Sequence, residues 1–124
     1  MTKIRGVRGA TTADSNTRDA VMDATAELLE EMLRSNKIVA DDLAAVQFTA
    51  SPDLVAEFPA VAARERLGWK YVPLINAVEI DRPGAQALCI RVLMFWNTEK
   101  AQDSVNHVYL KDAVNLRADL ASAQ

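Results

Sequence analysis

The chain has 124 residues, half of them apolar and a quarter charged, with a formal net charge of −3 at pH 7. These values are typical of one soluble globular domain, expected over residues 1–124, and they argue against nucleic acid as the main partner. No apolar run approaches the roughly 20 residues of a membrane span, and the polar start is unlike a signal peptide. We therefore expect no membrane partner and a cytoplasmic protein.

The residues that most often carry proton transfer and metal binding are scarce. Cys89 is the one cysteine and His107 the one histidine, so we expect no disulfide within the chain and no His/Cys metal cluster. The sequence has no nucleophile-elbow pattern and no Gly-rich nucleotide fingerprint. We therefore expect neither a metal nor a cofactor, and chemistry that depends on charge and shape.

The first third of the chain predicts a strand followed by a long helix. The segment over residues 3–12 opens with a short strand; Arg8 lies on one of its faces, and Gly9 is expected to begin the exit turn. The helix is predicted from Asn16 to Asn36, with Asn16 as its cap. Its apolar residues recur at helical spacing, which indicates a helix that packs on the core and carries no chemistry.

The middle third predicts two further strands around a short helix. A strand over 44–50 is followed by a break at Ser51-Pro52-Asp53, and Pro59 is expected to begin a short helix that ends before Gly68. One face of this helix carries residues at intervals of three, namely Phe58, Val61 and Arg64. A short strand is predicted over 71–75, continuing irregularly to residue 81.

The strand over 87–96 organises the prediction. With a period of two, one face carries Ala87, Cys89, Arg91, Leu93 and Phe95, and the other carries Leu88, Ile90, Val92, Met94 and Trp96. Both faces are apolar, as in a strand covered on both sides, apart from one guanidinium. Arg91 therefore needs a carboxylate, backbone carbonyls or an anionic ligand. A structural salt bridge and a small-anion site are both compatible with this strand alone, and Glu79 is the best candidate partner.

The end of the chain predicts a last strand over 106–110, with His107 and Tyr109 on one face. A helical turn follows over 111–114, and the tail from about residue 115 is expected to be mobile. Strands that alternate with helices favour the α/β (α+β) class, with a mixed sheet packed against the long helix.

Four arginines, from the predicted elements and the tail, share the pattern with one glutamate and one tyrosine. The residues concerned are Arg8, Arg64, Arg91, Arg117, Glu79 and Tyr109. Arginine forms planar two-pronged pairs with carboxylates, and a tyrosine hydroxyl donates one more hydrogen bond. The pattern favours a site for a small dicarboxylate that also bears a hydroxyl, without defining a reaction.

A family resemblance extends this interpretation. The segments that carry it are 4–12, Ser51-Pro52-Asp53-Leu54, Phe58-Pro59-Ala60 with Arg64-Glu65, 68–73, Cys89-Ile90-Arg91-Val92, 107–110 and 113–120. In this order the chain resembles the trimeric α/β class of chorismate mutase from about residue 3 to residue 120. The resemblance implies a homotrimer that forms a pseudo-α/β-barrel, with sites between subunits. It also implies an isomerase that converts chorismate to prephenate on the route to phenylalanine and tyrosine.

The resemblance also implies residue roles. Arg91 and Glu79 would be catalytic, with Arg8 and Tyr109 binding substrate from the same subunit. The neighbouring subunit would supply Phe58 and Arg64, and a tail with Leu116 and Arg117 would cover the ligand. The chain departs from the family pattern at two places. Val61 stands where a lysine can occur. Ile75-Asn76 replaces a Thr-Cys pair, so the Asn76 amide would remake a contact near the substrate's ring hydroxyl.

Two other functions remain open at this point. One is an imine/enamine deaminase type of enzyme on a similar trimer. The other is a non-catalytic module that binds an aromatic-pathway carboxylate.

Overall fold

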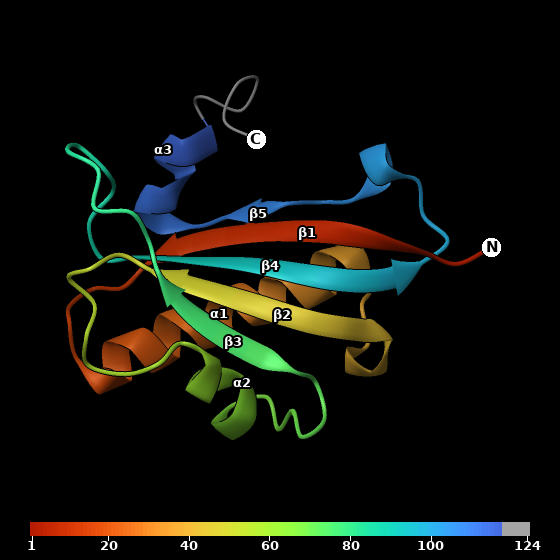
Figure 1. Cartoon of the computed structure of the whole chain (residues 1–124), viewed down its shortest axis with the longest axis horizontal. Coiled ribbons are helices and arrows are strands. Elements are labelled where there is room, and N and C mark those ends of the chain that lie inside the picture. The colour runs from red at the N-terminus through yellow and green to blue at the C-terminus, as the bar shows by residue number, and fades with distance from the viewer. Residues whose placement is uncertain (118–124) are drawn as a thin grey trace.

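The computed structural model describes residues 1–117, which form a five-stranded mixed sheet with the two longer helices packed on one face (Figure 1). The strands are β1 (Lys3–Thr12), β2 (Leu43–Ala50), β3 (Leu74–Val78), β4 (Cys89–Thr98) and β5 (Val108–Tyr109). They lie in the order β3-β2-β4-β1-β5. Strand β4 is antiparallel to β1 and β2, and each edge strand is parallel to its neighbour. The predicted fold class is confirmed.

The core lies between the sheet and α1 (Arg18–Asn36), which runs behind the strands in Figure 1. Helix α2 (Ala60–Glu65) packs beside α1 and next to β3, and α3 (Val114–Arg117) follows a 3₁₀ turn at Lys111–Ala113. Large side chains that are almost completely buried come from both layers and include Met22, Leu28, Leu29, Met32, Phe48, Ile90 and Met94. Burial of one such side chain contributes roughly 1.5–3 kcal/mol, so these contacts hold α1 against the sheet. Within residues 1–117, no helix has both the length and the apolarity to cross a membrane.

The predicted exit turn at Gly9 is wrong, because β1 continues without interruption to Thr12. Gly9 lies on the face of β1 that is covered by α1. A Cβ atom at this position would overlap the side chain of Met32 and crowd that of Leu28. The glycine therefore allows close approach of helix and strand rather than a turn.

The predicted cap of α1 is also wrong by one residue. The helix begins at Arg18, and the hydroxyl of Thr17 accepts a hydrogen bond from the Ala20 N–H at 3.2 Å. The side-chain oxygen of Asn16 instead accepts the backbone N–H groups of Val55 and Ala56, each at 3.0 Å. Both residue types cap helices well, and the loop that leads to α2 occupies the asparagine.

Three strand boundaries differ from the prediction. Strand β3 begins at Leu74 rather than at residue 71, because Pro73 has no N–H to donate to the ladder and only its carbonyl bonds β2, at Val46. Strand β5 contains two residues instead of five. Strand β4 begins at Cys89, because Leu88 turns the chain with a φ of +50°. The predicted strand over 44–50, the short helix after Pro59 and the helical turn near 111–114 are confirmed.

Candidate active site

The face of the sheet opposite α1 carries a row of residues from four strands. The register places Thr49, Arg91, Ala10 and Tyr109 side by side on β2, β4, β1 and β5. Adjacent strands lie about 4.8 Å apart, so the backbones of Arg91 and Tyr109 are about 10 Å apart with the small Ala10 between them. Arg8 belongs to the next row, where it pairs with Leu93. This face of β4 is only half-buried, so the prediction that both faces are covered does not hold within one chain.

Arg91 and Glu79 form the charged pair of this face. The Arg91 Nε lies 3.6 Å from a carboxylate oxygen of Glu79, which is an ion-pair distance but too long for a hydrogen bond. The same carboxylate oxygen accepts a hydrogen bond of 2.6 Å from the Thr49 hydroxyl. The Arg91 Nε is buried and has no hydrogen-bond partner in the described part of the chain. A buried donor without an acceptor is costly, so this guanidinium is prepared for an anionic group.

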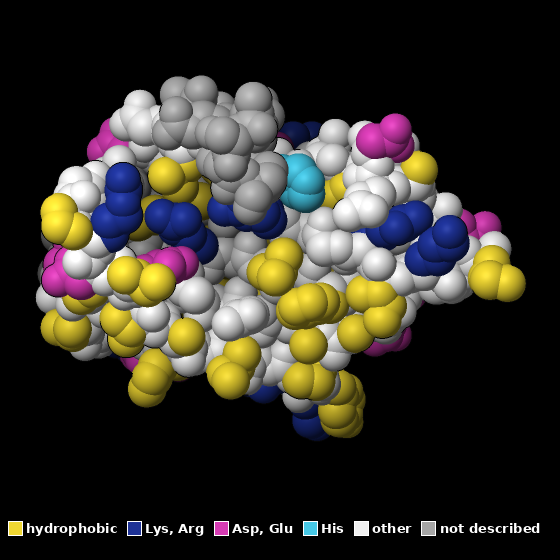
Figure 2. Space-filling model, turned by 45° about the horizontal axis from the view of Figure 1, so that its top comes forward, with side chains coloured by type: hydrophobic (Ala, Val, Ile, Leu, Met, Phe, Trp, Pro, Cys, Tyr) yellow, Lys and Arg dark blue, Asp and Glu magenta, His cyan; other side chains and the backbone are white. Residues whose placement is uncertain are grey.

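Two hollows meet at this pair. One, of about 200 Å³, is lined by Arg8, Gln47, Thr49, Glu79, Arg91, Val92 and Leu93. The other, of about 450 Å³, lies between the corner at residues 51–53 and the loop over 80–87, and it also includes Glu79, Cys89 and Arg91. Figure 2 shows the basic side chains as a dark blue band beside a hollowed region, with exposed hydrophobic side chains below it. The predicted grouping of Arg8, Glu79 and Arg91 is therefore present in one chain.

A second group of predicted residues lies around α2, away from Arg91. Phe58, Val61, Arg64 and Asn76 line a separate hollow of about 260 Å³. The Arg64 guanidinium donates hydrogen bonds of 3.2 Å to the carbonyl oxygens of Trp69 and Lys70. The Asn76 side-chain oxygen accepts the Ala60 N–H at 3.0 Å, so this residue caps α2 from the neighbouring strand. Within one chain, neither hollow at the Arg91–Glu79 pair includes these four residues.

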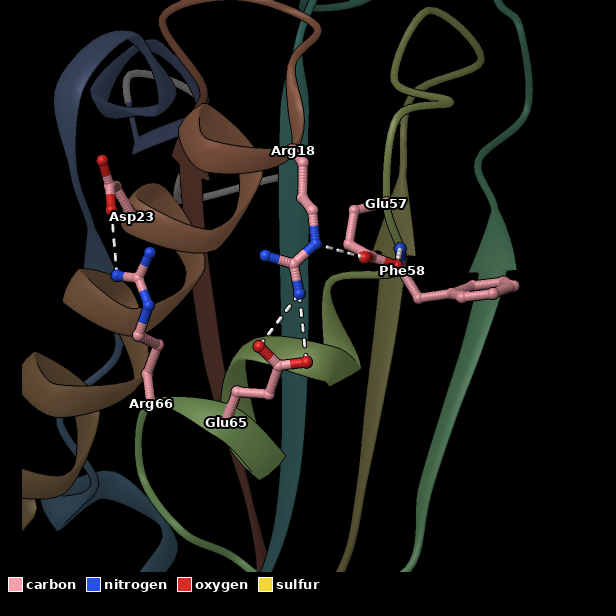
Figure 3. A network of polar contacts seen from close by, with 6 residues as sticks. All are labelled: Arg18, Asp23, Glu57, Phe58, Glu65 and Arg66. Carbon is pink, nitrogen blue, oxygen red and sulfur yellow. Dashed lines mark hydrogen bonds and ion pairs between the residues drawn. The ribbon is translucent and has the colours of Figure 1, made fainter.

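A network of ion pairs fixes this second group to α1 (Figure 3). Arg18 bonds Glu57 at 3.0 Å and both carboxylate oxygens of Glu65 at 2.9 and 3.0 Å. Glu57 in turn accepts the Phe58 N–H at 2.8 Å, and Phe58 points away from the network in Figure 3. These contacts join the start of α1, the end of α2 and the loop between β2 and α2, and they thereby orient Phe58.

The remaining predicted residues lie at the edges of the sheet. Ile75 is 62% exposed and shares the open face with Glu79, because both are odd-numbered positions at or just beyond β3. Tyr109 is buried and packs with Ala10, Ala113 and Leu116. Arg117 ends α3, but its side chain and the tail over residues 118–124 lie outside the described residues.

The single cysteine, Cys89, and the single histidine, His107, lie close to this face. Burial raises the pKa of the Cys89 thiol, although the positive charge of Arg91 acts in the opposite direction. His107 accepts the backbone N–H of Arg8 on its Nδ1 at 3.0 Å. Burial lowers the pKa of His107, and the charge of Arg8 lowers it further. Both groups are therefore neutral at pH 7, and His107 positions the strand that carries Arg8.

The lowered pKa of His107 predicts a loss of stability in acid. An unfolded histidine titrates near pH 6.5, above the folded pKa of His107. The stability that neutral His107 contributes is therefore complete above about pH 6.5 and is lost as pH falls through the folded pKa. His107→Asn keeps a neutral acceptor for the Arg8 N–H. Urea midpoints measured at about pH 7.5 and about pH 5 should therefore differ more in the wild type than in this variant. Equal acid losses in the two proteins would show that His107 does not carry this linkage.

Gln47 and Thr49 also belong to this site, although the sequence pattern does not single them out. Both lie on the open face of β2 and line the smaller hollow, and Thr49 bonds Glu79 directly. The signal was present in the alternation of buried Val46 and Phe48 with these two polar residues. A polar residue opposite a half-buried arginine becomes recognisable only when the pairing of β2 with β4 is known.

Similarity to known proteins identifies the family to which the chain belongs. The family model for chorismate mutase type I matches residues 4–120. The chain belongs to the chorismate mutase type I family. Chorismate mutase AroH of Thermus thermophilus is 51% identical over 98% of this chain and 99% of its own length. Chorismate mutase AroH of Bacillus subtilis (strain 168) is 43% identical over 95% of this chain and 93% of its own length.

The solved structure of a chorismate mutase from Clostridium thermocellum also resembles the model. It superposes with a TM-score of 0.87 at 44% identity, over 90% of this chain and 98% of the other. The chain is accordingly a chorismate mutase, and thus an isomerase. Neither the deaminase alternative nor the non-catalytic binding module is favoured by matches that run over nearly the whole chain.

Proposed function

We propose that this chorismate mutase rearranges chorismate to prephenate at the Arg91–Glu79 pair, in a site that two subunits of a homotrimer complete. The observation that carries the proposal is the buried Arg91 Nε, which has no hydrogen-bond partner within residues 1–117 and lies 3.6 Å from Glu79 at the junction of two hollows. The substrate has two carboxylates, an ether oxygen and a ring hydroxyl. These groups match a guanidinium with an unused Nε–H donor beside a carboxylate that accepts hydrogen bonds.

The reaction is a pericyclic [3,3] rearrangement, in which the ether C–O bond breaks while a C–C bond forms. No nucleophile, metal or proton transfer is required. Negative charge develops on the ether oxygen in the transition state, and the ring fragment becomes electron-poor. Arg91 would donate to the ether oxygen and to a side-chain carboxylate, as a preorganised cation in a partly buried site. Glu79 would accept the ring hydroxyl and favour the positive ring.

Substrate conformation is the second requirement. Chorismate must hold its enolpyruvyl side chain over the ring before the bonds can exchange. Arg8 and Tyr109 would bind the enolpyruvyl carboxylate; Arg8 lies on β1, the neighbour of β4, and Tyr109 lies on β5, one strand further out. Restriction to a reactive conformer supplies several kcal/mol of barrier reduction in well-oriented systems. A millionfold acceleration requires about 8 kcal/mol, which this restriction and one oxyanion donor supply together.

The second subunit would supply Phe58, Val61 and Arg64 as the opposite wall, with Ile75 and Asn76 at its border. Two observations support a shared site. Phe58, Val61 and Arg64 line neither hollow at Arg91 in their own chain. Apolar side chains are also exposed beside them, with Phe58 at 64% and Val78 at 75%, around a hollow of about 280 Å³. Such a surface is typical of an interface between subunits.

The remaining assignments complete the proposal. Leu116 packs against Tyr109 and would close the tail side of the site, and Arg117 would cover the bound ligand. We place the enzyme in the cytoplasm.

The test of the proposed function is the loss of chorismate absorbance with purified protein, with prephenate identified as the product. We expect turnover without added metal or cofactor. We also expect kcat to stay flat between about pH 7 and 9, because no proton moves and arginines remain charged in this range. A bell-shaped kcat profile centred in that window, or binding of chorismate without turnover, would refute the proposed mechanism.

A further inference from the structure

We propose that Asp53 is a positioning residue of this active site, which holds Leu88 in a left-handed backbone conformation and thereby sets the direction in which β4 presents Arg91. The proposal rests on the proposed role of Arg91 in catalysis. The Ser51-Pro52-Asp53 corner stands out in the sequence, and the mechanism above leaves it without a role.

The corner binds the backbone of Leu88, the residue just before β4, and of Cys89, its first residue. The Leu88 N–H donates to both carboxylate oxygens of Asp53, at 3.1 and 3.0 Å. The Ser51 hydroxyl donates to Asp53 at 2.5 Å and accepts the Cys89 N–H at 2.8 Å. The Ser51 N–H donates to the Cys89 carbonyl at 2.9 Å. A charged acceptor therefore anchors the point where the chain enters the central strand.

Leu88 needs this anchor because of its conformation. Its φ is +50°, a region in which the Cβ of a non-glycine residue lies too close to the following carbonyl oxygen. Its own carbonyl accepts the Ala13 N–H at 2.8 Å, so the peptide groups on both sides of Leu88 are fixed. Such backbone conformations persist only where the surroundings hold them. Without the carboxylate, we expect Leu88 to relax to a negative φ.

Relaxation at Leu88 would reach Arg91 directly. The ladder of β4 begins one residue later, with Cys89 opposite Thr12 and Ile90 opposite Ala50. Arg91 is the next residue, and its side chain lines the same hollow of about 450 Å³ as Asp53. A displacement of about 1 Å at a catalytic group costs up to about a hundredfold in rate. Asp53 thus acts on the reaction through the backbone of β4.

The test combines removal of the carboxylate with relief of the left-handed conformation. Asp53→Ala should lower kcat for chorismate by about 10- to 100-fold, with a smaller change in KM. Leu88→Gly lets residue 88 adopt a positive φ without steric cost. In the Asp53→Ala background, Leu88→Gly should therefore raise kcat by about tenfold or more, because the remaining bonds of Ser51 and Ala13 then suffice to hold the backbone. A residue that merely stabilises the fold, or one that contacts substrate, would show no such rescue.

Matched variants separate the outcomes. Asp23→Ala removes a carboxylate that pairs with Arg66 at 2.9 Å on the far side of the fold, and it should leave kcat unchanged. If Asp53→Ala does not fold, Asp53→Asn with and without Leu88→Gly provides the same comparison. Wild-type kcat in Asp53→Ala, or a loss that Leu88→Gly leaves in place, overturns the proposal. If Arg91→Ala remains fully active, the proposed function itself fails, whatever Asp53 does.

Discussion

Arg91→Ala is expected to lower kcat by about 10²–10³-fold, which corresponds to about 3–4 kcal/mol of transition-state stabilisation. The substitution removes the one guanidinium on the central strand whose buried Nε has no hydrogen-bond partner in the described chain. The loss should fall mainly on kcat, because the charge on the ether oxygen exists only in the transition state. Steady-state kinetics with chorismate measure both constants.

Two further variants test whether the loss of kcat depends on the guanidinium of Arg91. Arg91→Lys should restore activity only in part, because a point ammonium does not span an ether oxygen and a carboxylate together. Arg5→Ala removes an arginine from the adjacent strand, where it bonds the Lys100 carbonyl, and should leave kcat near the wild-type value. Arg91→Ala protein that folds with a normal thermal transition and keeps wild-type kcat would disprove the proposed mechanism.

The second large effect is a recovery of activity, which we expect when two inactive variants are combined in mixed trimers. Arg64→Ala and Arg91→Ala should each be nearly inactive alone. In the proposed trimer, each site formed when the two are unfolded together and refolded needs Arg91 from one subunit and Arg64 from its neighbour. An equal random mixture should restore about a quarter of the sites, since each side is independently intact with a probability of about one half. Activity of the refolded mixture, with hybrids identified by mass, measures this fraction.

A second mixture provides the matched control. Arg91→Ala and Glu79→Ala alter two residues that line the same hollows of one chain. No hybrid of these two variants contains a site with both residues intact, so refolding should restore nothing. No recovery in the first mixture would show that Arg64 and Arg91 do not come from different subunits, and recovery in the second would show that Arg91 and Glu79 do not act from one subunit.

The alternation of residues predicted much of the fold. The two faces of β4 follow the predicted division into odd and even positions, and the long helix ends at Asn36 as expected. These features depend on local periodicity and on burial, both of which are visible in a single sequence. The choice between Asn16 and Thr17 as the cap of α1 was not visible, because a loop residue about 40 positions away decides it.

The site was predictable as a set of residue types but not as an arrangement. Glu79 was recognised as the partner of Arg91, while the Thr49 hydroxyl that bonds Glu79 depends on the pairing of β2 with β3 and β4. Gly9 predicts a turn by its local sequence, but its role lies in a contact with Met32, far away in sequence. Long-range contacts of this kind leave no local pattern, so the sequence alone does not reveal them.

The alternation along β4 also limits how this gene can change. The half-buried residues on the open face of β4 are flanked by residues that fill the core, as Arg91 is by Ile90 and Val92. Loss or gain of one codon within the strand would exchange the two faces, turning the guanidinium toward α1 and the apolar side chains toward water. Substitutions at odd-numbered positions alter the open face, where we propose that substrate binds, while the core stays intact. Directed evolution of this enzyme should therefore recover point changes in the strand, and libraries that vary its length should yield almost no active clones.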